Sequence, residues 1–186
     1  MMPKSSRLLR PLLLLSLAAG LAALGAAPAA AAARLALVIG NGDYRDMGVL
    51  PNATNDAELI ASTLRDLDFE VVVSTNLGQN AMKRAIKDFG LRLDEVGPDA
   101  VGLFYYAGHG LQVKGANYLI PVEAEIKRES DIDIEAVNVD WVLAQMEYAA
   151  NDLNFLILDA CRNTRWRAAS APRPAASPRW TPPGAR

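Results

Sequence analysis

Short apolar runs alternate with amphipathic segments through the central part of this chain. Four runs are rich in Val, Leu and Ile and have the length of buried strands: Arg34–Gly40, Glu70–Thr75, Ala100–Tyr106 and Asn154–Asp159. Three further segments carry apolar residues at helical spacing: Asn55–Leu67, Gln79–Val96 and Val139–Tyr148. Strands that alternate with helices predict an α/β fold, in which a mostly parallel sheet has helices on both faces.

Turn-forming and polar residues mark the connections between these elements. The first run ends in Gly40-Asn41-Gly42, which predicts a turn and a loop. We expect the first helix to be capped by one of three polar residues, Asn52, Thr54 or Asn55. Lys114-Gly115 predicts the turn of a small hairpin within Leu111–Pro121. The acidic stretch Glu123–Glu135 is predicted to be a loop.

The two ends of the chain differ from this pattern. Residues 1–33 begin with a basic stretch, continue through an uncharged Leu-rich run and end in small residues, as a secretory signal peptide does. The protein is therefore expected to be secreted or periplasmic, and to contact a membrane only if that segment stays uncleaved. Residues 164–186 are dominated by Arg, Ala and Pro without periodicity, which predicts a disordered tail.

The charge of the chain is unevenly distributed, although its formal net value is only −2. All 21 acidic residues lie between positions 34 and 161, whereas residues 162–186 contain arginine and no acid. Binding to a nucleic-acid backbone requires a basic face, so this acidic body argues against nucleic acid as a partner. It suits peptides or proteins with basic residues.

The chain contains one histidine and one cysteine, and each follows a predicted strand. His109 lies between two glycines after the third strand, and Cys161 follows the fourth. Parallel strands end at one edge of a sheet, so we expect the two residues to be neighbours there. A lone cysteine with a lone histidine predicts a nucleophile and its base. The alternatives are a buried cysteine that acts as a small hydrophobe and a histidine that forms only structural hydrogen bonds.

The surrounding motifs resemble those of the caspase-like cysteine peptidases, the caspase–metacaspase superfamily. Tyr105–Gly110 (Tyr-Tyr-Ala-Gly-His-Gly) is similar to the family's histidine motif, and Leu156–Cys161 (Leu-Ile-Leu-Asp-Ala-Cys) to its cysteine motif. Arg34–Asn41 resembles the family's first strand, and Leu50–Ala57 the start of its first helix. The resemblance covers roughly residues 34–163. It implies a three-layer, caspase-haemoglobinase-like sandwich, of which this chain contains the large-subunit portion.

The resemblance also implies a cysteine-type endopeptidase with a Cys–His dyad. His109 would be the general base and acid, Cys161 the nucleophile, and the backbone N–H groups of Gly110 and Cys161 the oxyanion hole. Asp56 and Asp159 match the acidic pocket of metacaspases, which cleave after Arg or Lys. A pair of carboxylates can hold a guanidinium through two hydrogen bonds. The alternatives are an acid favoured by the helix dipole for Asp56 and a strand-end acid for Asp159.

Two features depart from the family. Arg162-Asn163 follows the cysteine where many metacaspases have His-Ser-Gly, although many bacterial caspase-like proteins have Arg-Asn. The family's sheet continues past the cysteine strand, whereas residues 164–186 show no strand pattern, so the C-terminal strands are expected to be missing. An inactive, truncated caspase-like module that acts as a binding or scaffold domain is therefore the alternative function. A weaker alternative is a domain that binds a small ligand at the Gly40-Asn41-Gly42 turn.

Some metacaspases require calcium bound by acidic residues, so the acidic stretch is a candidate calcium site. Its acids are Glu123, Glu125, Glu129, Asp131, Asp133 and Glu135. They lack the spacing and the turn glycine of a calcium-binding loop. We therefore expect no metal and no cofactor, and we interpret the stretch as a solvated charged segment.

Overall fold

The computed structural model describes residues 32–162, and of residues 161 and 162 it describes the backbone only. The predicted signal peptide, apart from its last two residues, and the predicted tail lie outside the described residues. Within residues 32–162, no helix is both long enough and apolar enough to cross a membrane.

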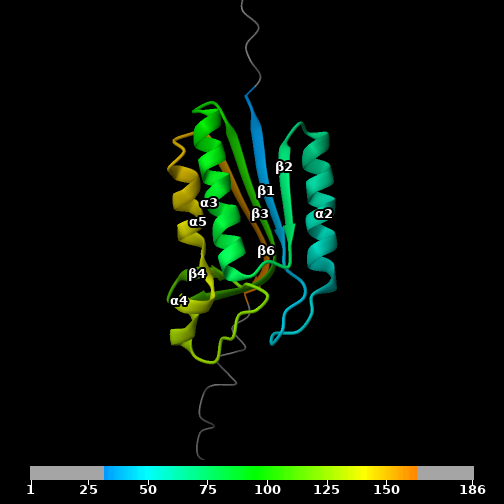
Figure 1. The fold of residues 1–186 in the computed structure, drawn as a ribbon, viewed down its shortest axis with the longest axis vertical. Coiled ribbons are helices and arrows are strands. Elements are labelled where there is room, and N and C mark those ends of the chain that lie inside the picture. The colour runs from blue at the N-terminus through cyan, green and yellow to red at the C-terminus, as the bar shows by residue number, and fades with distance from the viewer. Residues whose placement is uncertain (1–31, 163–186) are drawn as a thin grey trace, which may run out of the picture. The chain divides into compact units, whose positions relative to one another are not determined.

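A six-stranded sheet forms the centre of this part of the chain (Figure 1). Strand β1 (Arg34–Gly40) lies between β2 (Glu70–Thr75) and β3 (Val101–Val113), and it pairs in parallel with both. Strand β6 (Leu153–Arg162) pairs in parallel with the other side of β3. The predicted mostly parallel sheet is confirmed, and so is the expected contact between the third and fourth predicted strands.

Strand β3 is longer than the predicted Ala100–Tyr106 and contains the whole histidine motif. Its end is held on one side by β6 and on the other by β4 (Ala116–Leu119), which runs antiparallel to it. The turn between β3 and β4 is formed by Lys114 and Gly115, both with positive φ, as the hairpin prediction required. A two-residue strand, β5 (Val137–Asn138), extends the sheet beyond β4 and was not predicted.

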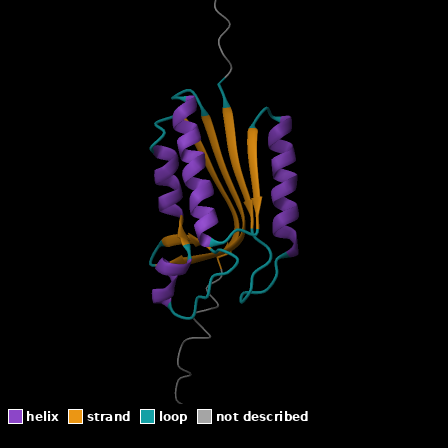
Figure 2. Cartoon of the chain, viewed as in Figure 1, coloured by secondary structure: helices purple, strands orange, loops and turns teal. Residues whose placement is uncertain are grey.

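Helices cover both faces of the sheet, which gives the three-layer arrangement in Figure 2. Alternate residues of a strand point to opposite faces, and β1 shows this clearly. Ala36 and Val38 pack against α2 (Pro51–Asp66) on one face. The neighbouring Leu35, Leu37 and Ile39 pack against α3 (Gln79–Val96) and α5 (Val139–Glu147) on the other. The bounds predicted for β1, β2 and α3 are confirmed.

The predicted cap of the first helix is wrong. Helix α2 begins at Pro51 and has Leu50 as its N-cap residue. The Leu50 side chain forms no capping hydrogen bond. Proline suits the first position of a helix because its φ is already helical and the N–H it lacks would have no partner there. Asn52, Thr54 and Asn55 therefore lie inside the helix.

The edge strand β6 exposes an apolar row on the side of the sheet that faces α2. Leu153, Phe155 and Ile157 are each 45–46% exposed, whereas Leu156 and Leu158 pack against the opposite core. Among the described residues β6 pairs with β3 alone, and the expected absence of further strands concerns residues outside the described part of the chain.

The acidic stretch is partly helical, with a 3-10 turn (Glu129–Asp131) followed by α4 (Ile132–Glu135), so the prediction of a loop is partly wrong. Its first residue, Glu123, has a structural role. The Glu123 carboxylate accepts a hydrogen bond of 2.8 Å from the backbone N–H of Gln79, at the start of α3. A negative charge there is favoured by the helix dipole. A Cβ atom on Gly78 would overlap this carboxylate, which explains the glycine before the helix.

We expect Glu123→Ala to lower the free energy of unfolding by about 1 kcal/mol, because it removes the carboxylate that accepts from the Gln79 N–H at the start of α3. Chemical denaturation of the full chain measures this change. Glu147→Ala is the matched control, since Glu147 is an exposed acid at the end of α5. Equal stability of Glu123→Ala and the control would show that the cap contributes nothing.

Candidate active site

The backbone brings His109 and Cys161 together. In the parallel pairing of β3 with β6, His109 and Cys161 are register partners, two positions beyond the last pair that joins β3 to β1. Both residues therefore lie at the carboxyl edge of the parallel sheet. They lie inside strands, not in the loops that the sequence indicated, because β4 and β6 extend the pairing of β3.

His109 is 9% exposed, and its imidazole contacts protein groups on two sides. Its Nε2 atom lies 3.3 Å from the carbonyl oxygen of Gly48. A carbonyl only accepts hydrogen bonds, so this contact places a proton on Nε2 and leaves Nδ1 unprotonated in the neutral ring. The ring of Tyr44 packs against the imidazole, with centroids 4.5 Å apart and planes tilted by 54°. Gly48 has φ of +84°, a left-handed conformation that favours glycine.

Two tyrosines hold the backbone of His109. The His109 N–H donates to the hydroxyl of Tyr44 at 2.8 Å, and the hydroxyl of Tyr106 donates to the His109 carbonyl at 2.9 Å. The two hydroxyls are themselves 3.1 Å apart. Burial raises the pKa of Tyr44 and raises that of Tyr106 well above its ordinary value, so both stay protonated. A Cβ atom on Gly108 would lie 2.5 Å and 2.6 Å from these hydroxyls, which leaves room only for glycine.

The loop that carries Tyr44 and Gly48 is anchored by two asparagines. Asn41 is fully buried, and its amide accepts from the N–H of Leu77 at 2.8 Å and donates to the Ile120 carbonyl at 3.2 Å. The carbonyl oxygen of the Asn76 side chain accepts from the N–H groups of Gly42 and Asp43, at 2.9 and 3.1 Å. These bonds join the loop after β1 to the loop after β2. They fix the position from which Tyr44 and Gly48 contact His109.

A cavity of about 190 Å³ beside this edge brings Asp56 and Asp159 together. Asp56 comes from α2 and Asp159 from β6, and the remaining wall is formed by Leu50, Pro51, Asn52, Ala53, Ala107 and Gly108. Asp159 accepts a 3.2 Å hydrogen bond from the hydroxyl of Tyr105. Within residues 32–160, no lysine or arginine forms an ion pair with either aspartate. Among the described side chains, the two carboxylates of this cavity therefore have no cationic partner.

The other predicted site group is the oxyanion hole. Gly110 lies opposite Leu119 of β4 and Arg162 of β6, and Cys161 lies opposite His109. Both backbone positions are thus at the same edge as His109. The role of their N–H groups stays a prediction.

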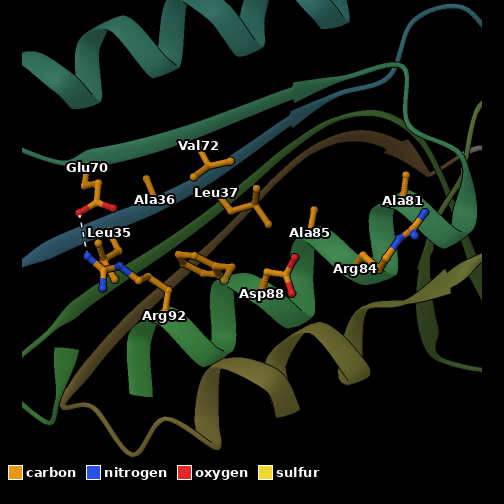
Figure 3. Close-up of a pocket in the computed structure, with 11 residues that line it drawn as sticks. Leu35, Ala36, Leu37, Glu70, Val72, Ala81, Arg84, Ala85, Asp88 and Arg92 are labelled. Carbon is orange, nitrogen blue, oxygen red and sulfur yellow. Dashed lines mark ion pairs between the residues drawn. The ribbon is translucent and has the colours of Figure 1, made fainter. Parts of the chain in front are cut away.

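A larger cavity, of about 430 Å³, lies between α3 and the edge strand β2 (Figure 3). Its floor is apolar, with Leu37 and Val72 among the lining residues. Arg92 and Glu70 form an ion pair of 3.6 Å at one end of it. Its lining contains two carboxylates, Glu70 and Asp88, but no cysteine, serine, threonine or histidine, so it lacks the residue types of a cysteine or serine nucleophile with its histidine base.

Two acids of the stretch Glu123–Glu135, Asp131 and Asp133, accept hydrogen bonds from neighbouring residues. Asp131 accepts hydrogen bonds from the N–H groups of Arg128 and Lys127, and these bonds lower its pKa. Asp133 accepts a 2.9 Å bond from the hydroxyl of Tyr118. Among the described residues, no three His, Cys, Asp or Glu side chains are grouped so that they could hold a metal ion.

Comparison with known proteins identifies the family of the chain. The family model for the caspase domain matches residues 33–179, and the chain belongs to the caspase domain family. It is similar to mucosa-associated lymphoid tissue lymphoma translocation protein 1 of Homo sapiens, with 35% identity over 129 residues. It is also similar to the homolog of that protein in Mus musculus, with 34% identity over 129 residues. Each match covers 69% of this chain and 15% of the relative, so the chain spans a small part of these relatives.

Proposed function

We propose that this protein is a cysteine-type endopeptidase with a Cys161–His109 dyad and that it cleaves after Arg or Lys. The observation that carries the proposal is the register of β3 and β6, which makes His109 and Cys161 direct neighbours at the carboxyl edge of the sheet. Membership of the caspase domain family supports the peptidase chemistry.

His109 acts as base and then as acid in this proposal. The Nε2–H group donates to the Gly48 carbonyl, so Nδ1 is the nitrogen that accepts the proton of the Cys161 thiol. The thiolate attacks the substrate carbonyl, and the oxyanion is stabilised by the N–H groups of Gly110 and Cys161. The protonated imidazole then gives its proton to the leaving amine. Water hydrolyses the resulting thioester, with His109 as base again, and restores the thiol.

The acidic cavity binds the basic side chain that precedes the cut. At about 190 Å³ it is smaller than the pockets of roughly 300–1,000 Å³ that hold drug-sized ligands, so a single side chain fits it better. Asp56 and Asp159 supply two carboxylates, which match a guanidinium or an ammonium group. Two carboxylates in one cavity support our proposal of a pocket of the metacaspase type, and the proposed mechanism needs no metal. Substrates are then peptides or proteins with basic residues, met outside the cytoplasm if residues 1–33 direct export.

Covalent labelling tests the proposal. Cys161 is the only cysteine in the sequence, so the intact mass of the full chain reports its modification directly. We expect one molecule per chain of a peptidyl acyloxymethyl ketone that ends in Arg, and at least about tenfold slower labelling by the matched probe that ends in Asp. Cys161→Ala is the control and should not be labelled. Absence of labelling by either probe, in folded protein, would favour the alternative of an inactive binding module.

A further inference from the structure

Tyr105 bonds to a residue that lines the acidic cavity but does not line the cavity itself. It belongs to β3, is 4% exposed, and packs with Ala53 and Ala57 of α2. Its hydroxyl reaches Asp159 Oδ2 at 3.2 Å. The lining of the cavity includes Asp159 but not Tyr105. Tyr105 therefore contacts the cavity only through the carboxylate.

The direction of this hydrogen bond is defined by the groups around Tyr105. Burial, then the neighbouring Asp159, and finally Asp56 raise the pKa of Tyr105 to about 12. The phenol is protonated at any pH at which a peptidase is assayed, so it donates and the carboxylate accepts. One oxygen of Asp159 is thereby held, and the second forms no hydrogen bond or ion pair with another described side chain.

We propose that Tyr105 is a specificity-determining positioning residue: its hydroxyl orients Asp159 so that this carboxylate and Asp56 receive a guanidinium in preference to an ammonium. The inference rests on the proposed function and adds to it a preference for Arg over Lys. A guanidinium is a planar fork whose two N–H groups must align with the carboxylate, so it depends on the orientation of that carboxylate. An ammonium is a compact charge with three rotatable donors and tolerates a carboxylate that turns.

The chain offers a matched control for the test. Tyr118 also donates its hydroxyl to an aspartate, Asp133, at 2.9 Å, but this pair is solvent-exposed and Asp133 does not line the cavity. Tyr105→Phe and Tyr118→Phe each delete one hydroxyl and leave the ring in place. Both are made in the full chain and assayed with two fluorogenic peptides that differ only in Arg or Lys before the cut.

We expect Tyr105→Phe to reduce kcat/KM for the Arg peptide about tenfold, mainly through KM, because one hydrogen bond to a charged group is lost. The Lys peptide should lose less than about threefold, and Tyr118→Phe should change neither. An equal loss for both peptides, or a loss confined to kcat, would overturn the inference, since a general structural defect has that effect.

A binding measurement separates this inference from the proposed catalysis. N-acetyl-arginine amide and N-acetyl-lysine amide are titrated into Cys161→Ala, with and without Tyr105→Phe, and followed by NMR. Selective weakening of arginine amide binding supports the inference even if the protein proves unable to cleave. Cleavage of Arg peptides with an unchanged Arg-to-Lys ratio in Tyr105→Phe overturns the inference and leaves the proposed function intact. Failure of Cys161→Ala to bind arginine amide overturns the inference and the basic-residue pocket together.

Discussion

Asp159→Asn and Asp56→Asn are each expected to lower kcat/KM for an Arg peptide by about a hundredfold, with the fold unchanged. Each substitution keeps the size of the side chain and removes one of the two carboxylates in the cavity. The bound guanidinium then keeps one ionic partner in place of two, and a charge-assisted hydrogen bond is replaced by a weaker neutral one. Peptides that end in citrulline, a neutral analogue of arginine, should be cleaved poorly by the wild type and should lose much less in either variant.

The control for Asp56→Asn and Asp159→Asn is the same substitution at an exposed aspartate outside the cavity. Asp152 is exposed and immediately precedes β6, at the opposite end of this strand from Asp159, so Asp152→Asn is the matched control. Fluorogenic assays of all three variants give the ratios. Cleavage of the Arg peptide by Asp56→Asn and Asp159→Asn at the wild-type rate would exclude this cavity as the specificity pocket.

Much of the fold could be predicted because its elements follow from local patterns. The apolar runs of β1 and β2 and the stripe of α3 depend on residues close in sequence, and their predicted bounds are confirmed. The Lys114-Gly115 turn depends on two residues that can adopt positive φ. The start of α2 was missed because three polar residues suggested a cap, whereas Pro51 with its fixed φ begins the helix.

The position of His109 could be predicted only in part. The order of strands indicated that it would lie near Cys161, and the register of β3 with β6 confirms this. The sequence did not reveal that the histidine motif belongs to β3. This extension of β3 depends on its pairing with β4 and β6, and the position of β6 is not visible from local sequence. The roles of Tyr44 and Gly48 were missed for the same reason.

The contacts of Tyr44 and Gly48 depend on how the loop after β1 is folded. Asn41 and Asn76 anchor this loop through hydrogen bonds between residues more than 30 positions apart. No local pattern reveals such bonds. The one local signal was an asparagine between two glycines, Gly40-Asn41-Gly42, which predicted a turn but not the partners of the asparagine side chain.

Substitution of either member of the dyad is expected to have the largest effect of all. Cys161→Ala and His109→Ala should each reduce cleavage of an Arg peptide by at least about 10³-fold, because a nucleophile and its base act as a unit. The double variant should be no slower than the slower single one, for the same reason. Far-ultraviolet circular dichroism and the unfolding midpoint of each variant report whether the fold is retained.

The most direct measurement of the central claim is the initial rate of Arg-peptide cleavage by the purified full chain, beside that of Cys161→Ala at equal concentration. The dyad predicts turnover by the wild type that saturates with substrate, and a rate in Cys161→Ala that cannot be distinguished from buffer. Undiminished cleavage by Cys161→Ala, or a folded wild-type protein that cleaves no basic peptide, would contradict it.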